Sequence, residues 1–172
     1  MQSFLTLWST FFDLCRLRLK PQDLPYSHVL LNVTLFFYAM IGFSLSLIHA
    51  SILEAILSTI ADVSLLVILV SSLLYLAHYP GRIVQTLTAL VGASCVLGVF
   101  TFPVMYWFEF LKDVEIAIPI LLLLGLGFWN FLVYAHVLRH ALAVPFFVGV
   151  LFTFIIFTLN FSVLNIIVSL SN

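Results

Sequence analysis

A single carboxylate, Asp62, lies deep inside a long apolar stretch of the chain. A charged side chain at the centre of a bilayer is costly, so it usually faces a polar partner or a cavity. Asn130 and Asn160 fall at similar depths in two other apolar stretches, where asparagine commonly bonds across to another helix. We therefore predict an intramembrane polar cluster of Asp62, Asn130 and Asn160. The cluster is either a proton relay or ion site, or a polar clamp between helices. We favour the clamp, because one Asp and two Asn provide few groups for an ion pathway.

The other polar residues do not form a catalytic pattern. His136 and His140 are four residues apart, which places them on one face of a helix. A metal site needs more ligands, and no third His, Cys or carboxylate lies nearby in sequence. The motifs G-x-S-x-G, H-E-x-x-H, G-x-x-x-x-G-K-[ST] and G-x-G-x-x-G are missing. We therefore expect no catalytic residues, no metal and no cofactor, in a protein that is not an enzyme.

Composition indicates the class of protein. Of the 172 residues, 64% are hydrophobic and 8% are charged, whereas soluble domains carry about 25% charged residues. Such a chain suits the bilayer, where apolar side chains face lipid. Six Lys and Arg residues stand against seven Asp and Glu residues, so no basic field is available for nucleic acid. The expected partners are the lipid bilayer and other membrane protein subunits or further copies of this chain.

Hydropathy predicts the elements that position the polar cluster. The expected fold is all-α: a polytopic transmembrane bundle of five spans in residues 28–172, after an amphipathic interfacial helix in residues 1–20 and a proline-containing linker in residues 21–27. Each span meets the roughly 20 residues needed to cross the hydrocarbon. Short connections predict that consecutive spans pack as antiparallel neighbours. The weakest break lies near Ala50. The predicted spans are 28–48, 53–78, 84–108, 116–138 and 144–169.

The first twenty residues have the pattern of an amphipathic helix. Polar residues recur every three or four positions and draw one stripe opposite an apolar face. Such a helix lies in the membrane interface, which we favour, or packs on the protein's own spans. Pro21 and Pro25 end it, and Ser27 is suited to cap the next helix. The expected interface-binding residues are Trp8, Phe11, Phe12, Arg16, Arg18 and Lys20.

The basic residues predict the orientation of the bundle. A basic group precedes the first span, Arg82 separates the second span from the third, and Arg139 separates the fourth from the fifth. Cytoplasmic loops carry an excess of Lys and Arg, so these three ends should be cytoplasmic. We therefore expect a multi-pass protein of the cell's inner (cytoplasmic) membrane. Its N-terminus should be cytoplasmic and its C-terminus on the opposite side.

The order of these segments resembles a known family. A proline-containing segment, residues 21–27, leads into the first span, and the third span opens with GRIVQTLTAL at residues 81–90. The fourth span ends with AHVLRHA at residues 135–141, and Ala143-Val144-Pro145 opens the fifth. This arrangement resembles bacterial members of the Ypt-interacting-protein (YIP) family of five-span membrane proteins. Eukaryotic members are associated with Rab-type GTPases and vesicle traffic, so the resemblance implies the five-span fold and a role in membrane organisation.

Three functions fit the sequence. The first is a non-enzymatic accessory or scaffold subunit of a larger inner-membrane complex, because catalytic motifs are missing and 16% of the residues are aromatic. The second is a small oligomeric transporter or channel that uses the midplane carboxylate Asp62. The third is a membrane-organisation or trafficking role of the YIP type, suggested by the amphipathic N-terminus and the family resemblance.

Overall fold

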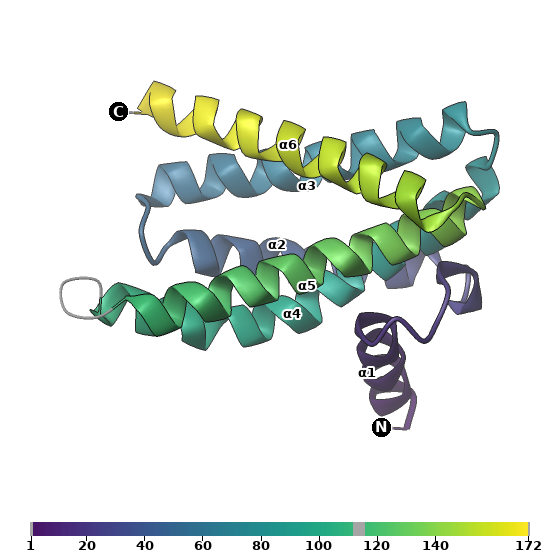
Figure 1. Cartoon of the computed structure of the whole chain (residues 1–172), viewed down its shortest axis with the longest axis horizontal. Coiled ribbons are helices and arrows are strands. Elements are labelled where there is room, and N and C mark those ends of the chain that lie inside the picture. Colours follow the sequence, from purple (N-terminus) through teal and green to yellow (C-terminus); the bar gives the residue numbers. More distant parts are fainter. Residues whose placement is uncertain (1, 112–115, 172) are drawn as a thin grey trace.

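The computed structural model describes residues 2–111 and 116–171, and within them the fold is all-α (Figure 1). Five of the helices are long and apolar enough to cross a membrane. The prediction of an all-α bundle of five spans is therefore confirmed, and the protein is a multi-pass membrane protein. The helices are α1 (Gln2–Cys15), α2 (His28–Ser46), α3 (Ile52–Leu76), α4 (Ile83–Leu111), α5 (Ala117–Leu142) and α6 (Phe146–Ser171), with short 3-10 turns η1 (Pro21–Asp23) and η2 (Pro80–Arg82).

The five spans form a closed ring in the order α2, α4, α5, α6, α3 and back to α2, because each of these pairs packs closely together. Figure 1 shows α3 and α6 above the other three spans. Consecutive spans are neighbours in the ring except for α3 and α4, which touch much less than the other pairs do. The prediction of consecutive neighbours is wrong at this one place, since α4 lies between α2 and α5.

The two halves of the ring are packed differently. We call the end that holds α1, η2 and the α5–α6 connection proximal, and the opposite end distal. Buried side chains on α4 run from Val84 to Leu97, and those on α5 gather between Val133 and Leu142. On α3 they include Leu66, which lies on the proximal side of Asp62. The hydrophobic core therefore fills the proximal half, whereas the distal half is packed less tightly.

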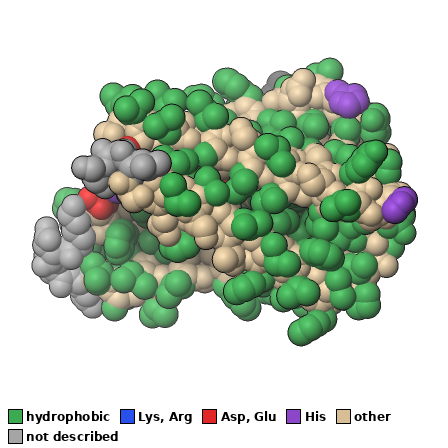
Figure 2. Space-filling view, turned by 90° about the horizontal axis from the view of Figure 1, so that it is seen from above, with side chains coloured by type: hydrophobic (Ala, Val, Ile, Leu, Met, Phe, Trp, Pro, Cys, Tyr) green, Lys and Arg blue, Asp and Glu red, His purple; other side chains and the backbone are tan. Residues whose placement is uncertain are grey.

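The outside of the ring is apolar, as a lipid-facing surface requires. Figure 2 shows one side of the bundle, where hydrophobic side chains cover most of the visible surface. Acidic atoms appear there at the distal end and histidine rings at the proximal end. Large side chains such as Phe36, Ile68 and Phe147 are exposed in the middle or at the ends of the spans. Such exposure is expected where lipid replaces water as the solvent.

Capping side chains fix where two of the spans begin. Ser27 accepts a hydrogen bond from the Leu30 amide at 3.2 Å and caps α2, as its position suggested. Ser51 and Glu54 form a reciprocal capping box at the start of α3. The S-x-x-E pattern therefore secures the break near Ala50 that hydropathy marked only weakly.

Three helices end in a left-handed residue that is not glycine. Leu17, His78 and Ala143 have φ values of 60°, 64° and 56°. After α1, the Arg18 amide donates to Asp13 O and the Leu17 amide to Leu14 O, which is the Schellman pattern of a helix end. The prediction that the first helix reaches residue 20 is therefore wrong, since α1 stops at Cys15. The fourth span instead continues past Arg139 to Leu142.

Helix α1 packs on the bundle along one face and runs across the direction of the spans (Figure 1). The Phe11 ring fills the space that a side chain at Gly92 would need, and the Cys15 thiol donates to Ala93 O at 3.6 Å. Burial raises the pKa of this thiol to about 11, so it is un-ionised at neutral pH. The indole N–H of Trp129 donates to Cys15 O at 2.9 Å. In the described part of α1, the apolar side chains of Phe11, Leu14 and Cys15 are thus covered by protein.

Of the expected interface-binding residues, one is buried against the bundle and others are exposed. Phe11 is 7% exposed, so its assignment to lipid contact is wrong: an amphipathic face can be buried by a neighbouring helix as well as by lipid. Phe12, Arg16, Arg18 and Lys20 are exposed and remain available to the membrane surface. The side chain of Trp8 lies outside the part of the chain whose side chains are described.

The orientation can be tested at two exposed histidines, His49 near the distal end and His78 near the proximal end. If the basic proximal end is cytoplasmic, a His49→Cys variant should react with a membrane-impermeant maleimide in intact cells. The matched His78→Cys variant should react only after the membrane is permeabilised. The opposite labelling pattern would show that the bundle is inserted the other way round.

Candidate functional site: a polar cavity at Asp62

Asp62 accepts hydrogen bonds from two other helices. The Tyr38 hydroxyl of α2 donates to Oδ2 at 2.7 Å, and Asn160 Nδ2 of α6 donates to Oδ1 at 2.5 Å. Each carboxylate oxygen thus has a donor, an arrangement that suits the ionised form of the group, which can only accept. Both donors are neutral, so they stabilise the carboxylate without cancelling its charge.

Helix geometry places these three residues at one depth. At 1.5 Å per residue, α3 is about 37 Å long and Asp62 lies about 15 Å from its start. Tyr38 lies about 15 Å from the start of α2, and Asn160 about 21 Å from the start of α6. All three are therefore near the middle of their spans. The bilayer core is about 30 Å thick, so Asp62 lies far from either surface.

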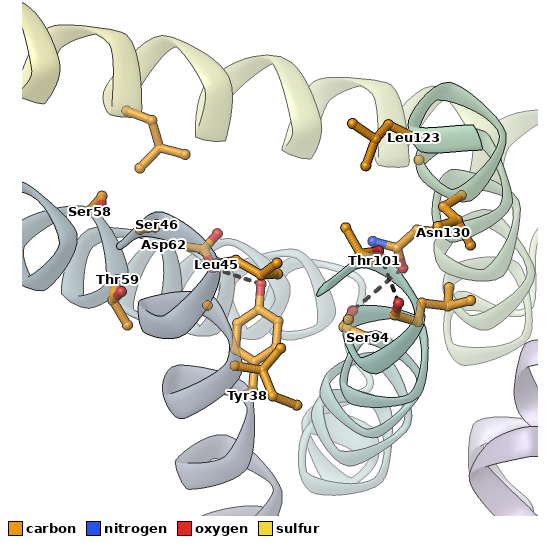
Figure 3. Close-up of a pocket in the computed structure, with 17 residues that line it drawn as sticks. Tyr38, Leu45, Ser46, Ser58, Thr59, Asp62, Ser94, Thr101, Leu123 and Asn130 are labelled. Atoms are coloured by element: carbon orange, nitrogen blue, oxygen red, sulfur yellow. Dashed lines mark hydrogen bonds between the residues drawn. The ribbon is translucent and has the colours of Figure 1, made fainter. Parts of the chain in front are cut away.

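A cavity of about 390 Å³ opens beside Asp62 in the distal half of the ring. Its lining extends from Tyr38 and Asp62 to Ser46, the last residue of α2, and includes side chains from all five spans. Figure 3 shows Asp62 and Tyr38 on one side, facing Asn130 and Ser94 on the other. The looser packing of the distal half therefore leaves space that reaches the midplane carboxylate.

Hydroxyl groups in this cavity present oxygen atoms that can accept further hydrogen bonds or bind a cation. Thr59 Oγ1 donates its proton to Ala55 O at 2.7 Å, and Thr101 Oγ1 donates to Leu97 O at 2.9 Å. Ser58 likewise donates to Ala55 O at 3.2 Å. Each proton is thereby used on the backbone of the same helix. The unused lone pairs add to the acceptors of Asp62.

Asn130 lies across the cavity from Asp62 and has a different partner. The Ser94 hydroxyl of α4 lies 3.5 Å from Asn130 Oδ1 and 3.1 Å from the Tyr134 hydroxyl, both on α5. A second cavity of about 260 Å³ is lined by Asp62, Asn130 and Asn160 together. The structure thus brings the three residues of the predicted polar cluster to one place. Asp62 and Asn160 are in direct contact, whereas Asn130 belongs to a facing pair of helices.

Tyr38, Tyr134 and Ser94 belong to this site, although the sequence did not single them out. A buried tyrosine hydroxyl needs a hydrogen-bond partner, so a tyrosine in the middle of a span is itself a sign of a polar site. Tyr38 and Tyr134 both lie inside predicted spans, and Tyr38 lies at a depth similar to that of Asp62. Because tyrosine is counted as a hydrophobic residue, the composition does not reveal its polar hydroxyl.

No Lys or Arg is among the described residues that line either cavity. The basic side chains Arg16, Arg18, Lys20, Arg82 and Arg139 belong to the proximal segments and the ends of helices. An ionised Asp62 is therefore held by hydrogen bonds alone. An ionised carboxylate in a cavity without a cationic side chain would attract a cation or a proton.

The histidine pair lies away from this site. His136 and His140 share one face of α5, with ring centroids 4.6 Å apart, and His136 Nε2 bonds Leu19 O at 3.0 Å. Their visible role is to fasten the linker after α1 to the bundle. Across the described residues no group of three or more His, Cys, Asp or Glu side chains gathers into a possible metal site.

The fold and the site define a class: a multi-pass helical membrane protein with a cavity, lined by both polar and apolar side chains, that reaches a carboxylate in the middle of the spans. Comparison with known proteins adds no family to this description. No protein-family model matches the chain, and neither a curated protein nor a solved structure does.

A double-mutant cycle tests the contact between Asp62 and Asn160. Hydrogen bonds between transmembrane helices contribute about 0.6 kcal/mol on average and up to about 1.7 kcal/mol. We expect a coupling free energy in this range between Asp62→Leu and Asn160→Leu, measured by reversible unfolding in detergent. Ser162→Ala on the exposed side of α6 is the control and should add to Asp62→Leu without coupling. A coupling of zero for Asn160 would contradict the contact.

Proposed function

We propose that this protein is a small membrane transporter or channel that holds a cation or a proton at Asp62. The observation that supports the proposal is a midplane carboxylate with neutral donors only, beside a polar cavity. An ionisable side chain at this depth in a transmembrane segment is typical of an ion or proton pathway. The proposal also accounts for the acceptors that line the cavity.

The chemistry of the lining favours a hard cation or a proton over an organic anion. The groups on offer are the Asp62 carboxylate, hydroxyl oxygens with their protons already engaged, and Asn130 Oδ1. Oxygen ligands of this type suit cations such as Na⁺, K⁺ or Mg²⁺. An anion would meet the negative potential of Asp62 instead of a cationic side chain.

The closed proximal half indicates how such a protein would work. Leu66, Leu90 and Val137 are almost completely buried on the proximal side of the cavity. We infer that a cation at Asp62 would exchange with the distal side in this arrangement, because the proximal side is closely packed. Transport across the membrane would require the proximal half to open while the distal half closes, which is the alternating-access scheme.

Flux through reconstituted vesicles tests this function. Wild-type protein should dissipate an imposed gradient of H⁺, Na⁺ or K⁺, and Asp62→Asn should lower the flux to that of protein-free vesicles, because the charge that holds the ion is removed. Two controls separate charge from structure. Tyr38→Phe removes one donor but keeps the carboxylate, and Asp13→Asn removes a carboxylate on α1, so both should retain flux. An inactive wild type, or an Asp62→Asn variant with full flux, would contradict the proposal.

A second candidate is an accessory or scaffold subunit of a larger inner-membrane complex. The blind proximal end of the cavity favours it, because a cavity that ends in a packed core can simply hold helices together around a bound water or ion. Helix α5 also offers a close approach to a foreign helix. A Cβ atom built at Gly125, which does not line the cavity, would meet no atom of this chain within 4 Å. Small residues on transmembrane helices allow such close packing.

A crosslinking experiment in native membranes tests the scaffold proposal. A photo-reactive residue at Gly125 should capture a partner subunit or a second copy of the chain, whereas one at the exposed Ile68 of α3 should capture lipid only. Gentle solubilisation should then release a complex larger than the monomer. A monomer without crosslinks at either position would speak against an accessory role.

The YIP-type role in membrane organisation is a further proposal that rests on the family resemblance. The five-span count and the exposed Arg16, Arg18 and Lys20 after α1 support it, because basic residues beside an amphipathic helix are attracted to anionic lipids. The same charges support placement in the inner membrane with the proximal end in the cytoplasm.

A further inference from the structure

A further polar cavity, of about 640 Å³, lies at the proximal end of the bundle, far from Asp62. We call it the proximal basic cavity. Three separate segments line it: the linker after α1, the η2 turn, and the connection between α5 and α6. Its charged side chains are Lys20, Arg82 and Arg139 with a single carboxylate, Asp23, so two net positive charges remain with His140 neutral.

Neutral groups hold the two arginines, so their charges are not cancelled. Arg82 Nη1 donates to Ala141 O at 2.9 Å, and its guanidinium lies 4.4 Å from the centre of the Tyr79 ring. Arg139 donates to His140 Nε2 through Nε at 3.2 Å and Nη2 at 3.1 Å, and it lies over the Phe146 ring. A guanidinium has five N–H donors, and these bonds use one on Arg82 and two on Arg139. Most donors in the cavity remain for a ligand.

The backbone around this cavity is held in place. Gln22 Nε2 donates to His140 O at 2.7 Å, and Gln85 Nε2 donates to Leu24 O at 2.6 Å, so the linker is tied to α5 and α4. Ala143 adopts its left-handed conformation at the end of α5 and lines the cavity. A site whose segments are already fixed loses little entropy when it binds.

We propose that the proximal basic cavity binds a phosphate group, and that the source of this group is the headgroup of an anionic phospholipid. Planar guanidinium groups match phosphate oxygens geometrically, and two of them with a lysine can neutralise its charge. The cavity is at the end of the spans, at headgroup depth, and the neighbouring Phe147 is 80% exposed, where it can contact acyl chains. Basic pockets between helices on the cytoplasmic side bind such headgroups.

Binding to the purified full-length protein in neutral detergent tests this inference. Native mass spectrometry should show that phosphatidylglycerol binds and that phosphatidylcholine with the same acyl chains binds much more weakly. Each arginine near the surface contributes about 1 kcal/mol, so Arg139→Gln should weaken binding about fivefold and the double variant Arg82→Gln/Arg139→Gln about 25-fold. Arg139→Lys should bind more tightly than Arg139→Gln but less tightly than wild type, since it keeps the charge and loses the planar guanidinium.

The deciding variant is Arg139→Gln, because its guanidinium contacts only the His140 ring and the Phe146 ring, so the fold should tolerate the change. Arg18→Gln, an exposed basic residue outside the cavity, is the matched control and should bind like wild type. Equal losses in Arg18→Gln and Arg139→Gln, or none in the double variant, would overturn the site.

Competition with inorganic phosphate distinguishes the two sources of the phosphate group. We expect millimolar phosphate to leave bound phosphatidylglycerol in place, because the free ion lacks the acyl chains that contact the spans. Displacement of the lipid by phosphate at equal concentration would overturn the lipid assignment. This test is independent of the flux measurement on Asp62, because neither arginine lines the distal cavity.

Discussion

Placing a carboxylate in the middle of a bilayer costs about 2.5–3.5 kcal/mol of free energy. The hydrogen bonds in the distal half offset part of that cost. Asp62 on α3 accepts hydrogen bonds from a hydroxyl of α2 and a carboxamide of α6. These bonds tie three neighbouring members of the ring together at mid-depth. On the facing side, Ser94, Asn130 and Tyr134 tie α4 to α5 in the same way. The two polar groups face each other across the cavity, so the ring is joined by polar bonds on both sides of an open centre.

The proximal half provides the rigid base that an open centre needs. Here α4 is buried among its neighbours, and glycine allows close contact at Gly149 against the α5 backbone. The linker after α1 is hydrogen-bonded to both α4 and α5. Close packing thus stabilises the ring at its proximal end, and polar bonds stabilise it at mid-depth. Hydrophobic contact holds the ring closed where no ligand is expected, and polar side chains are concentrated where one can enter.

Hydropathy and charge alternation predicted the five spans from the sequence, and the direct contact of Asp62 with Asn160 agrees with their predicted similar depth. What the sequence missed has physical reasons. Leu17, His78 and Ala143 end helices without the glycine that usually marks such an end, so the predicted ends of α1 and α5 were wrong. Phe11 was assigned to lipid because an apolar helix face looks the same whether lipid or protein covers it. Tyr38 escaped notice because periodicity counts it as apolar, although its hydroxyl completes the site.

The two cavities are linked by the helices that carry them. Helix α5 bears Asn130 at the distal cavity and Arg139 at the proximal basic cavity, about 14 Å apart along its axis. Opening the proximal half would separate α5 from η2 and break the bond from Arg82 to Ala141 O. The same separation would pull apart the three segments that line the proximal basic cavity. A phosphate group bound there would interact with the closed arrangement alone, and it would then shift the equilibrium toward that arrangement. An anionic lipid would then keep the Asp62 cavity accessible from the distal side.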